Sequence, residues 1–169
     1  MNRVTDQVMI DALQQKWLVE EALTHRPTIQ IGCGMKWIPG IVNTDPNPER
    51  AMWADVACFG DDLPFDDGAF NCVVSSHVIN VFPDPIAAFR EWARVLRPGG
   101  WCCHVIPDWR YAPNRKSSRY RFEKQHHCWR GPVVFQAEVM DKLSDVFRVV
   151  ELECFEVFKW SFKLRAVRL

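Results

Sequence analysis

The sequence has no apolar run long enough to cross a membrane, no excess of charge of either sign and no even set of cysteines. Its 21 basic and 21 acidic residues balance, so no general electrostatic field attracts or repels nucleic acid. The seven cysteines cannot all pair within one chain, which favours reduced thiols acting as small buried hydrophobes. The N-terminus also lacks the apolar core of a signal peptide. These absences predict a cytoplasmic protein with no membrane partner.

Material for a hydrophobic core is present. Apolar residues make up 48% of the sequence, and they include 8 Trp and 11 Phe. A chain of 169 residues with this composition predicts one domain, residues 1–169, that buries a substantial core.

Helical and strand patterns alternate along the chain. Periodicity predicts helices at about 5–24 and 133–144 and a third whose apolar face runs from Ala88 to Leu96. Short apolar runs predict strands at 28–31, 41–44, 53–57, 70–75, 101–106, 147–155 and 158–167, the third being the weakest. This order is typical of an α/β fold with a doubly wound, mostly parallel sheet. The last strand should run antiparallel, because its connection is too short for a parallel crossover.

A glycine turn, Gly32-Cys33-Gly34, follows the first strand directly. Glycines there let the backbone turn sharply and approach a ligand closely. Asp45 ends the next strand, where a carboxylate can accept both hydroxyls of an adenosine ribose. A plain strand-ending turn and an aspartate that caps it form the alternative interpretation.

A phosphate-bearing cofactor fits this region poorly. A dinucleotide site requires a third glycine at the start of a full helix, whereas this sequence has Trp37 there. Only residues 35–40 separate the two strands, too few for a normal crossover helix. An NAD-dependent oxidoreductase is therefore disfavoured but remains an alternative.

Five segments between residues 28 and 108 then occur in a characteristic order: Gly32–Gly34, Gly40–Asp45, Leu63–Phe70, Ser75–Ile79 and Arg94–Gly100. They resemble the class I methyltransferases of the type 11 group. The resemblance implies a Rossmann-like, seven-stranded sheet and S-adenosyl-L-methionine as the cofactor.

The resemblance also implies a set of cofactor-binding residues. Gly32, Cys33 and Gly34 would lie along the methionyl group. Asp45 would hold the ribose, and Pro46 would contact the adenine. Asp55 and Val56 would border the adenine edge, with Asp61 or Asp62 as rivals for that role. Ser75, Ser76 and His77 would line the cofactor cleft.

Three departures from the family pattern stand out. Gln30 replaces an acid that most class I members carry, although an amide is common in this branch. The first crossover helix is missing or reduced to a turn. Asn80-Val81 replaces a usual Glu-His pair. The last change keeps open a non-catalytic module that binds S-adenosylmethionine or S-adenosylhomocysteine and regulates a partner.

Methyl transfer is an in-line displacement in which positioning supplies much of the acceleration, and a base is needed only if the acceptor must lose a proton. His77 is the candidate catalytic residue, because it follows a strand at the edge where open α/β sheets place their sites. A hydrogen-bonded cleft histidine is the alternative.

The stretch 108–132 is basic, aromatic and irregular, which predicts an excursion that shapes the acceptor site. Asp108, Arg110 and Tyr111 follow a strand end and are candidate contacts for a small or sugar-like acceptor. Nucleic-acid binding by charge and stacking is less favoured. Cys102 and Cys103 should face opposite sides of their strand, so a shared zinc site is disfavoured and no metal is predicted. The sequence leaves the oligomeric state open.

Overall fold

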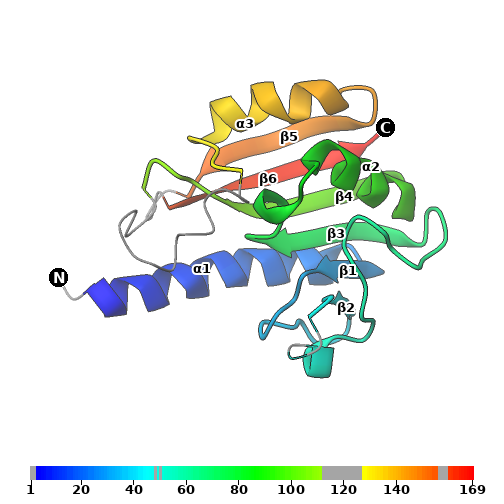
Figure 1. The fold of residues 1–169 in the computed structure, drawn as a ribbon, viewed down its shortest axis with the longest axis horizontal. Helices are drawn as coiled ribbons and strands as arrows, with labels where there is room; N and C mark the ends of the chain where they lie inside the picture. The colour runs from blue at the N-terminus through cyan, green and yellow to red at the C-terminus, as the bar shows by residue number, and fades with distance from the viewer. Residues whose placement is uncertain (1–2, 48, 50, 112–126, 156–159) are drawn as a thin grey trace.

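The computed structural model describes residues 3–47, 49, 51–111, 127–155 and 160–169. The helices are α1 (Arg3–Thr24), α2 (Pro85–Val95) and α3 (Pro132–Glu138), with short 3-10 helices η1 (Ala51–Trp53), η2 (Ile79–Val81) and η4 (Met140–Leu143). The strands are β1 (Thr28–Ile31), β2 (Val42–Thr44), β3 (Phe70–Ser76), β4 (Leu96–Pro107), β5 (Phe147–Cys154) and β6 (Ser161–Arg168). Figure 1 shows these elements arranged around one sheet.

The strands follow the order β2-β1-β3-β4-β6-β5. Strands β2, β1, β3 and β4 are parallel to one another, whereas β6 runs antiparallel to both β4 and β5. The predicted α/β class and the antiparallel last strand are therefore confirmed. Because β1, β2 and β3 are parallel, their carboxyl ends meet at one edge of the sheet. The loops that follow these strands, which hold Gly32, Asp45 and His77, therefore lie at that edge.

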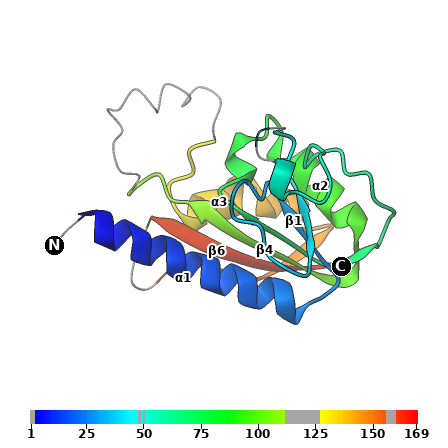
Figure 2. The same cartoon turned by 90° about the horizontal axis from the view of Figure 1, so that it is seen from below.

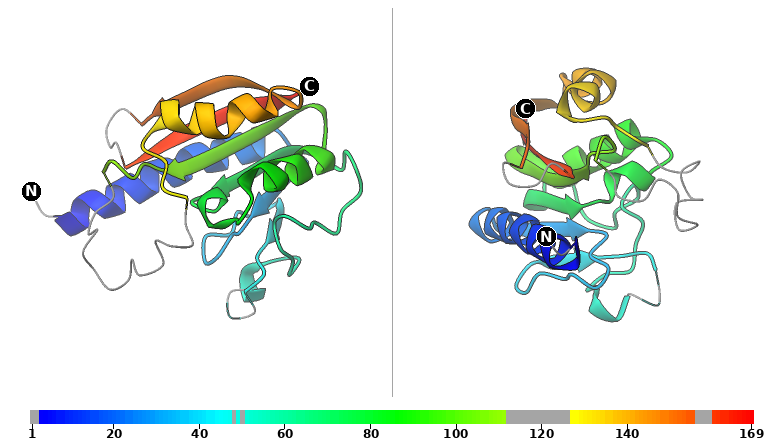
Figure 3. Two further views of the ribbon diagram at one scale, coloured as in Figure 1. Left: turned by 45° about the horizontal axis from the view of Figure 1, so that its top comes forward. Right: turned by 90° about the vertical axis from the view of Figure 1, so that its left-hand side faces the viewer.

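Helices cover both faces of the sheet. Figure 2 shows α1 on one face and α2 and α3 on the other, and Figure 3 shows α2 and α3 side by side over that second face. The alternation of β4 divides its side chains between two apolar clusters, with Cys102 on the α2 side and Cys103 beneath α1. The prediction that these two cysteines face opposite sides is confirmed.

The seventh strand predicted near 53–57 does not form in the described residues, which hold six strands. Only the isolated parallel bridge between Thr44 and Val56 represents it, and η1 occupies the start of this segment. The cause is local. The Asp55 carboxylate accepts hydrogen bonds from the backbone N–H and the side-chain amide of Asn43, at 2.7 and 3.1 Å, and this pins the segment to β2 over a short distance.

The predicted lack of a first crossover helix is confirmed, since residues 32–41 form turns. Ile38 fills part of the missing helix's place, because it is fully buried under α1 with Leu18 and Ala22. The Asn43 side chain holds it there, accepting from the Ile38 N–H at 2.8 Å and donating to its carbonyl at 3.0 Å.

Helix α2 braces the loop that leads to β3. Asp84 caps it by accepting from the N–H groups of Ile86 and Ala87, and Pro85 occupies its first turn. Its buried face includes Trp92, whose indole N–H donates to the Gly60 carbonyl at 2.7 Å. This bond fixes Gly60 against the sheet. In the described part of the chain, no helix has the length and hydrophobicity of a membrane span, and no cluster of side chains is suited to a metal ion.

Candidate functional site

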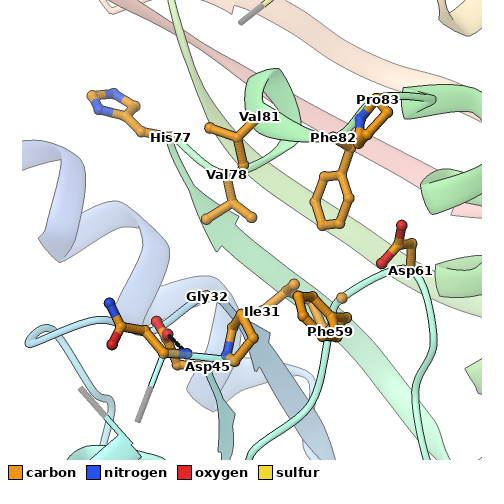
Figure 4. Close-up of a pocket in the computed structure, with 13 residues that line it drawn as sticks. Ile31, Gly32, Asp45, Phe59, Asp61, His77, Val78, Val81, Phe82 and Pro83 are labelled. Carbon is orange, nitrogen blue, oxygen red and sulfur yellow. Dashed lines mark hydrogen bonds between the residues drawn. The ribbon is translucent and has the colours of Figure 1, made fainter. Parts of the chain in front are cut away.

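A cavity of about 560 Å³ opens at the carboxyl edge of β1, β2 and β3. This volume lies within the range of about 300–1,000 Å³ that is usual for small-molecule sites. The residues that line it are Ile31, Gly32, Asp45, Pro46, Asn47, Phe59, Gly60, Asp61, His77, Val78, Val81, Phe82 and Pro83. Figure 4 shows His77, Val78 and Val81 on the wall opposite Gly32 and Asp45.

The glycine turn after β1 forms the base of the cavity. Gly32 and Gly34 have φ values of 63° and 54°, in the left-handed region that favours glycine. A Cβ atom on Gly32 would lie 2.7 Å from a methyl group of Val78. Glycine is thus required here both for the backbone conformation and for the close approach of the opposite wall.

Asp45 lines the cavity with a carboxylate whose orientation is fixed. The side chain is buried, and its two oxygens accept from the N–H groups of Gly34 at 2.8 Å and Asn47 at 2.9 Å. A carboxylate has about four acceptor positions, so these two bonds leave room for further donors. A vicinal diol such as a ribose fits this remaining capacity.

Gln30 places an unsatisfied acceptor beside the glycine turn. Its Nε2 donates to the Lys36 carbonyl at 3.1 Å, whereas its buried Oε1 has no partner among the described residues. A buried acceptor without a donor is costly to the protein. Gln30 is not among the residues that line the cavity, so this acceptor lies behind the glycine turn rather than on the cavity surface.

The far end of the cavity suits a planar apolar ring. Phe59, Gly60, Asp61 and Phe82 meet there. A Cβ on Gly60 would lie 2.4 Å from the Ile31 side chain and 2.8 Å from the Phe82 ring, so only glycine keeps these walls in place. The shape of this end of the cavity therefore depends on Gly60, whose carbonyl accepts the hydrogen bond from the Trp92 indole.

Three aspartates, Asp55, Asp61 and Asp62, are candidates for the adenine edge, and they differ in whether they line the cavity. Asp61 lines the cavity, whereas Asp62 and Asp55 do not. Asp55 is occupied by Asn43, and Val56 forms the bridge to Thr44. The acid that reaches the cavity is thus Asp61, which precedes the Leu63-Pro64 motif.

Ser75 and Ser76 also lie outside the cavity lining. Ser75 is fully buried, and its Oγ lies 2.7 Å from Nδ1 of His104, whose Nε2 lies 2.8 Å from Sγ of Cys102. Burial lowers the pKa of His104 to about 3, so this histidine is neutral in the folded protein. Ser76 ends β3 and is half-buried.

Cys33 lies between the two glycines with its thiol turned inward. Burial, and secondarily the negative charge of Asp45, raises the pKa of this thiol to about 11. The thiol donates to the Gly34 carbonyl at 3.6 Å. Cys33 and Gly34 therefore shape the turn from behind, while Gly32 faces the cavity.

His77 stands at the mouth of the cavity in an unusual conformation. It has a φ of 57°, and it is the one non-glycine residue with a positive φ in the described chain. Its N–H donates to the Val105 carbonyl at 2.8 Å, and its Nε2 lies 2.8 Å from Oγ of Ser161. His77 is exposed and is among the residues that line the cavity, and Figure 4 shows its ring directed away from Gly32 and Asp45.

Asp108, Arg110 and Tyr111 form their own cluster just beyond β4. Asp108 is fully buried, and its carboxylate accepts from Nη2 of Arg110 at 2.6 Å, which raises the pKa of the guanidinium. The guanidinium lies 5.2 Å from the centre of the Tyr111 ring. None of the three lines the cavity. Most of the predicted excursion 108–132, at residues 112–126, lies outside the described residues.

The replaced pair Asn80-Val81 forms most of η2. Val81 lines the cavity, and Asn80 is buried behind it, with its carbonyl accepting from the His127 N–H at 2.8 Å. Sequence reasoning did not assign these lining residues to the site: Ile31, Asn47, Phe59, Gly60, Val78, Val81, Phe82 and Pro83. The Gly60-Asp61 pair before Leu63-Pro64 was the available signal for its far end.

Comparisons with known proteins agree with this architecture. Residues 40–104 match a family model described as a methyltransferase domain. A Thermotoga maritima structure described as an S-adenosylmethionine-dependent methyltransferase, "possible histamine N-methyltransferase", superposes with a TM-score of 0.69 at 19% identity, covering 92% of this chain and 87% of that one. An S-adenosylmethionine-dependent methyltransferase from Aquifex aeolicus gives 0.67 at 16% identity, covering 92% and 89%. At these low identities the superpositions show a shared fold alone.

A curated relative matches only a short segment. An uncharacterized 37.1 kDa protein in transposon TN4556 of Streptomyces fradiae is 43% identical over 47 residues, which is 28% of this chain and 14% of that protein. Residues 40–104 are thus similar to a methyltransferase domain, and the fold of the chain is that of the S-adenosylmethionine-dependent methyltransferases with which it superposes.

Proposed function

We propose that this chain, as a single cytoplasmic domain, binds S-adenosylmethionine in the cavity beside β1 and transfers its methyl group in line to a small-molecule acceptor. The observation that carries this proposal is Asp45, a buried carboxylate that faces the cavity with two backbone donors fixing it and two acceptor positions remaining. No phosphate-binding helix begins at the glycine turn, which suits a cofactor without phosphate.

The proposed binding mode assigns each end of the cavity. Asp45 accepts the ribose hydroxyls, and Pro46 lies against the adenine. Asp61 borders the adenine edge in place of Asp55, since only Asp61 lines the cavity. The methionyl end lies along Gly32, the residue of the glycine turn that lines the cavity.

The other residues predicted for the cofactor site do not line the cavity, and they support the residues that do. Cys33 and Gly34 hold the turn, and the Gly34 N–H orients Asp45. Val56, Asp55, Ser75 and Ser76 support the strands rather than contact the ligand.

When bound, the cofactor supplies a methyl group activated on a sulfonium. The chain's contribution is then orientation and exclusion of water. Val78, Val81, Phe82 and Pro83 form an apolar wall opposite Asp45, which limits access of water. His77 at the mouth contacts the acceptor, and Asp108, Arg110 and Tyr111 border its path beyond the end of β4. The acceptor is a small molecule, with sugar-linked compounds as one class and amines as another, the latter suggested by the name given to the Thermotoga neighbour.

A binding module without catalysis is the second candidate function. It is favoured by one observation: Val81, in place of the usual histidine, gives the cavity wall an apolar side chain that cannot move a proton. Such a module would bind S-adenosylmethionine or S-adenosylhomocysteine and transmit that state to a partner.

Calorimetry with S-adenosylhomocysteine and, separately, with NAD tests the ligand. We expect binding of the first alone, and binding of NAD alone would overturn the proposal. Transfer is tested by incubating the protein with methyl-labelled cofactor and a panel of phenols, monosaccharides, primary amines, carboxylates and thiols. Label in one class of the panel supports the enzyme, whereas tight binding without transfer to any class supports the binding module.

A further inference from the structure

The guanidinium of Arg110 is held in place by only part of its hydrogen-bonding capacity. A guanidinium has five N–H donors. Nε donates to the two oxygens of Asp108 at 3.0 and 3.1 Å, and Nη2 donates to Oδ2 of Asp108 at 2.6 Å and to Sγ of Cys154 at 3.4 Å. Among the residues that the structure describes, none accepts from Nη1, and the Arg110 side chain is 41% exposed. The two N–H groups of Nη1 therefore remain for a ligand.

Asp108 holds this guanidinium rather than meeting a ligand itself. Its carboxylate is fully buried, and it also accepts from the backbone N–H of Arg110 at 3.0 Å and from the Cys154 thiol at 3.9 Å. A buried carboxylate is costly unless it is paired. Its backbone is fixed as well, because the Asp108 N–H donates to the Trp160 carbonyl at 2.7 Å. The buried end of the pair thus orients the exposed end.

Two further residues restrict the guanidinium. Gly131 has a φ of 93°, which favours glycine, and a Cβ atom there would lie 2.6 Å from Cζ and Nη2 of Arg110. Glycine is therefore required for the guanidinium to lie where it does. The Tyr111 ring lies 5.2 Å from Cζ of Arg110, within the range of a cation–π contact. A guanidinium held in this way is preorganised for an oxyanion, whose geometry its planar fork matches.

This cluster lies beside the mouth of the cavity. His77, which lines the cavity, donates its N–H to the carbonyl of Val105 in β4, the strand that leads directly to Asp108. Asp108 bonds in turn to Trp160, and the next residue, Ser161, has its hydroxyl 2.8 Å from Nε2 of His77. A small molecule that reaches from the cavity past its mouth therefore meets the Arg110 cluster.

The charges of the two regions differ in sign. Among the described residues that line the cavity, Asp45 and Asp61 are carboxylates, and none is a lysine or an arginine. The exposed guanidinium of Arg110 lies outside, and the exposed residue next to Gly131 is a second arginine, Arg130. Negative charge inside suits the sulfonium of the cofactor, whereas positive charge outside suits an anion on the acceptor.

We propose that Arg110 binds an anionic group, a carboxylate or a phosphate, on the part of the acceptor that stays outside the cavity, and that Asp108 is its positioning residue. This inference rests on the proposed function and names the charge class of its acceptor. The oxyanion accepts from Nη1, so the pair with Asp108 stays intact. No bond is made or broken at this subsite, and Arg110 therefore contributes affinity and orientation.

Ligands that share a phenol and differ in charge test the subsite. The anions are para-hydroxyphenylacetate and para-hydroxyphenyl phosphate, the neutral ligand is para-hydroxyphenylacetamide, and the cation is tyramine. Each is titrated into the protein with S-adenosylhomocysteine bound, while ¹H–¹⁵N NMR follows the Arg110 Nε–H signal, identified by its loss in Arg110→Lys. We expect a shift with one or both anions, which tells carboxylate from phosphate. A shift with tyramine or the amide as large as with the anions, or with no ligand, overturns the inference.

Arg90 supplies a matched control, because it also pairs with an aspartate, Asp145, at 3.0 and 3.2 Å and is 47% exposed. In calorimetry, Arg110→Gln should weaken binding of the anion about tenfold, the scale of a lost charged hydrogen bond, and Arg90→Gln should leave it unchanged. Arg110→Lys keeps Asp108 paired with a cation, and it should weaken binding of the anion even if Arg110→Gln does not fold. Equal losses in the Arg90 and Arg110 variants, or an unchanged affinity in Arg110→Lys, would contradict the proposal.

Activity gives a second measurement, made within the panel class that takes up label. An acceptor that carries a carboxylate should have a kcat/KM about tenfold above that of its amide. Asp108→Asn should reduce this preference by raising KM for the anionic acceptor, with KM for S-adenosylmethionine unchanged within about twofold. Equal use of the two acceptors overturns the inference and leaves the proposed function intact. Absence of S-adenosylhomocysteine binding overturns the proposed function itself, whereas the same titrations of the ligand-free protein still decide whether Arg110 binds an anion.

Discussion

Two serine–histidine pairs of nearly equal length occupy opposite environments in this molecule. His104 and Ser75 lie 2.7 Å apart in the core, packed against Trp92 and Phe89, whereas His77 and Ser161 lie 2.8 Å apart at the cavity mouth. Both histidines are within hydrogen-bond distance of a buried hydroxyl, but only His77 can meet a ligand. The difference shows that the role of such a pair depends on access to solvent and substrate, and the following predictions test that division.

The largest expected effect is on stability at the core pair. His104→Ala removes a buried ring and leaves the Ser75 hydroxyl and the Cys102 thiol without their partner. We expect a loss of about 2–4 kcal/mol in the free energy of unfolding, measured by urea denaturation. The matched variant His77→Asn serves as the comparison. Equal losses in the two variants would contradict the division into a structural and a functional pair.

The next effect is on the affinity for the cofactor product, and it compares the carboxylates of Asp45 and Asp55. Asp45→Ala removes a buried charged acceptor from the cavity, so the affinity for S-adenosylhomocysteine should fall by about 1–3 kcal/mol in calorimetry. Asp55→Ala is the control, since that carboxylate bonds to Asn43 outside the cavity. If Asp55→Ala weakened binding as much as Asp45→Ala, the assignment of the ribose to Asp45 would be wrong.

The burial of His104 should also make the stability of the protein depend on pH. Burial lowers the pKa of His104 to about 3 in the folded state, below the ordinary value of 6.5. Between these two values the unfolded chain binds one more proton than the folded protein. Stability should therefore fall as the pH drops from 6.5 toward 3. The stability of His104→Gln, measured in parallel, should decline less steeply, and parallel curves would show that His104 is not buried neutral.

The sequence predicted the parts of this site that depend on spacing along the chain. The glycine turn, Asp45 and the missing crossover helix follow from residues 32–45 alone, because few conformations link two adjacent parallel strands so briefly. The α/β order followed from periodicity, and the antiparallel direction of β6 followed from its short connection.

Features that depend on tertiary contacts were not predictable in this way. Ser75 and His77 are two residues apart, but one faces the core and the other the cavity, because the strand ends between them and the backbone turns left-handed at His77. The reach of Asp61, rather than Asp55, into the cavity depends on the hydrogen bonds of Asn43. Ser161, whose hydroxyl lies within hydrogen-bond distance of His77, is 84 residues away on a strand whose pairing with β4 no local pattern specifies.

The smallest expected effect is on stability at the cavity mouth, and it tests whether the backbone of His77 is held for function. Asparagine tolerates the left-handed region well, so His77→Asn should change the free energy of unfolding by no more than about 0.5 kcal/mol. His77→Ala places a less tolerant residue at the same φ and should cost somewhat more, because alanine gains nothing there to offset the strain. Both variants remove the imidazole, so both should lose transfer activity to a similar degree despite their different stabilities. If activity followed stability across the two variants instead, the conformation of His77 would serve the fold and the exposed pair would be structural like the buried one.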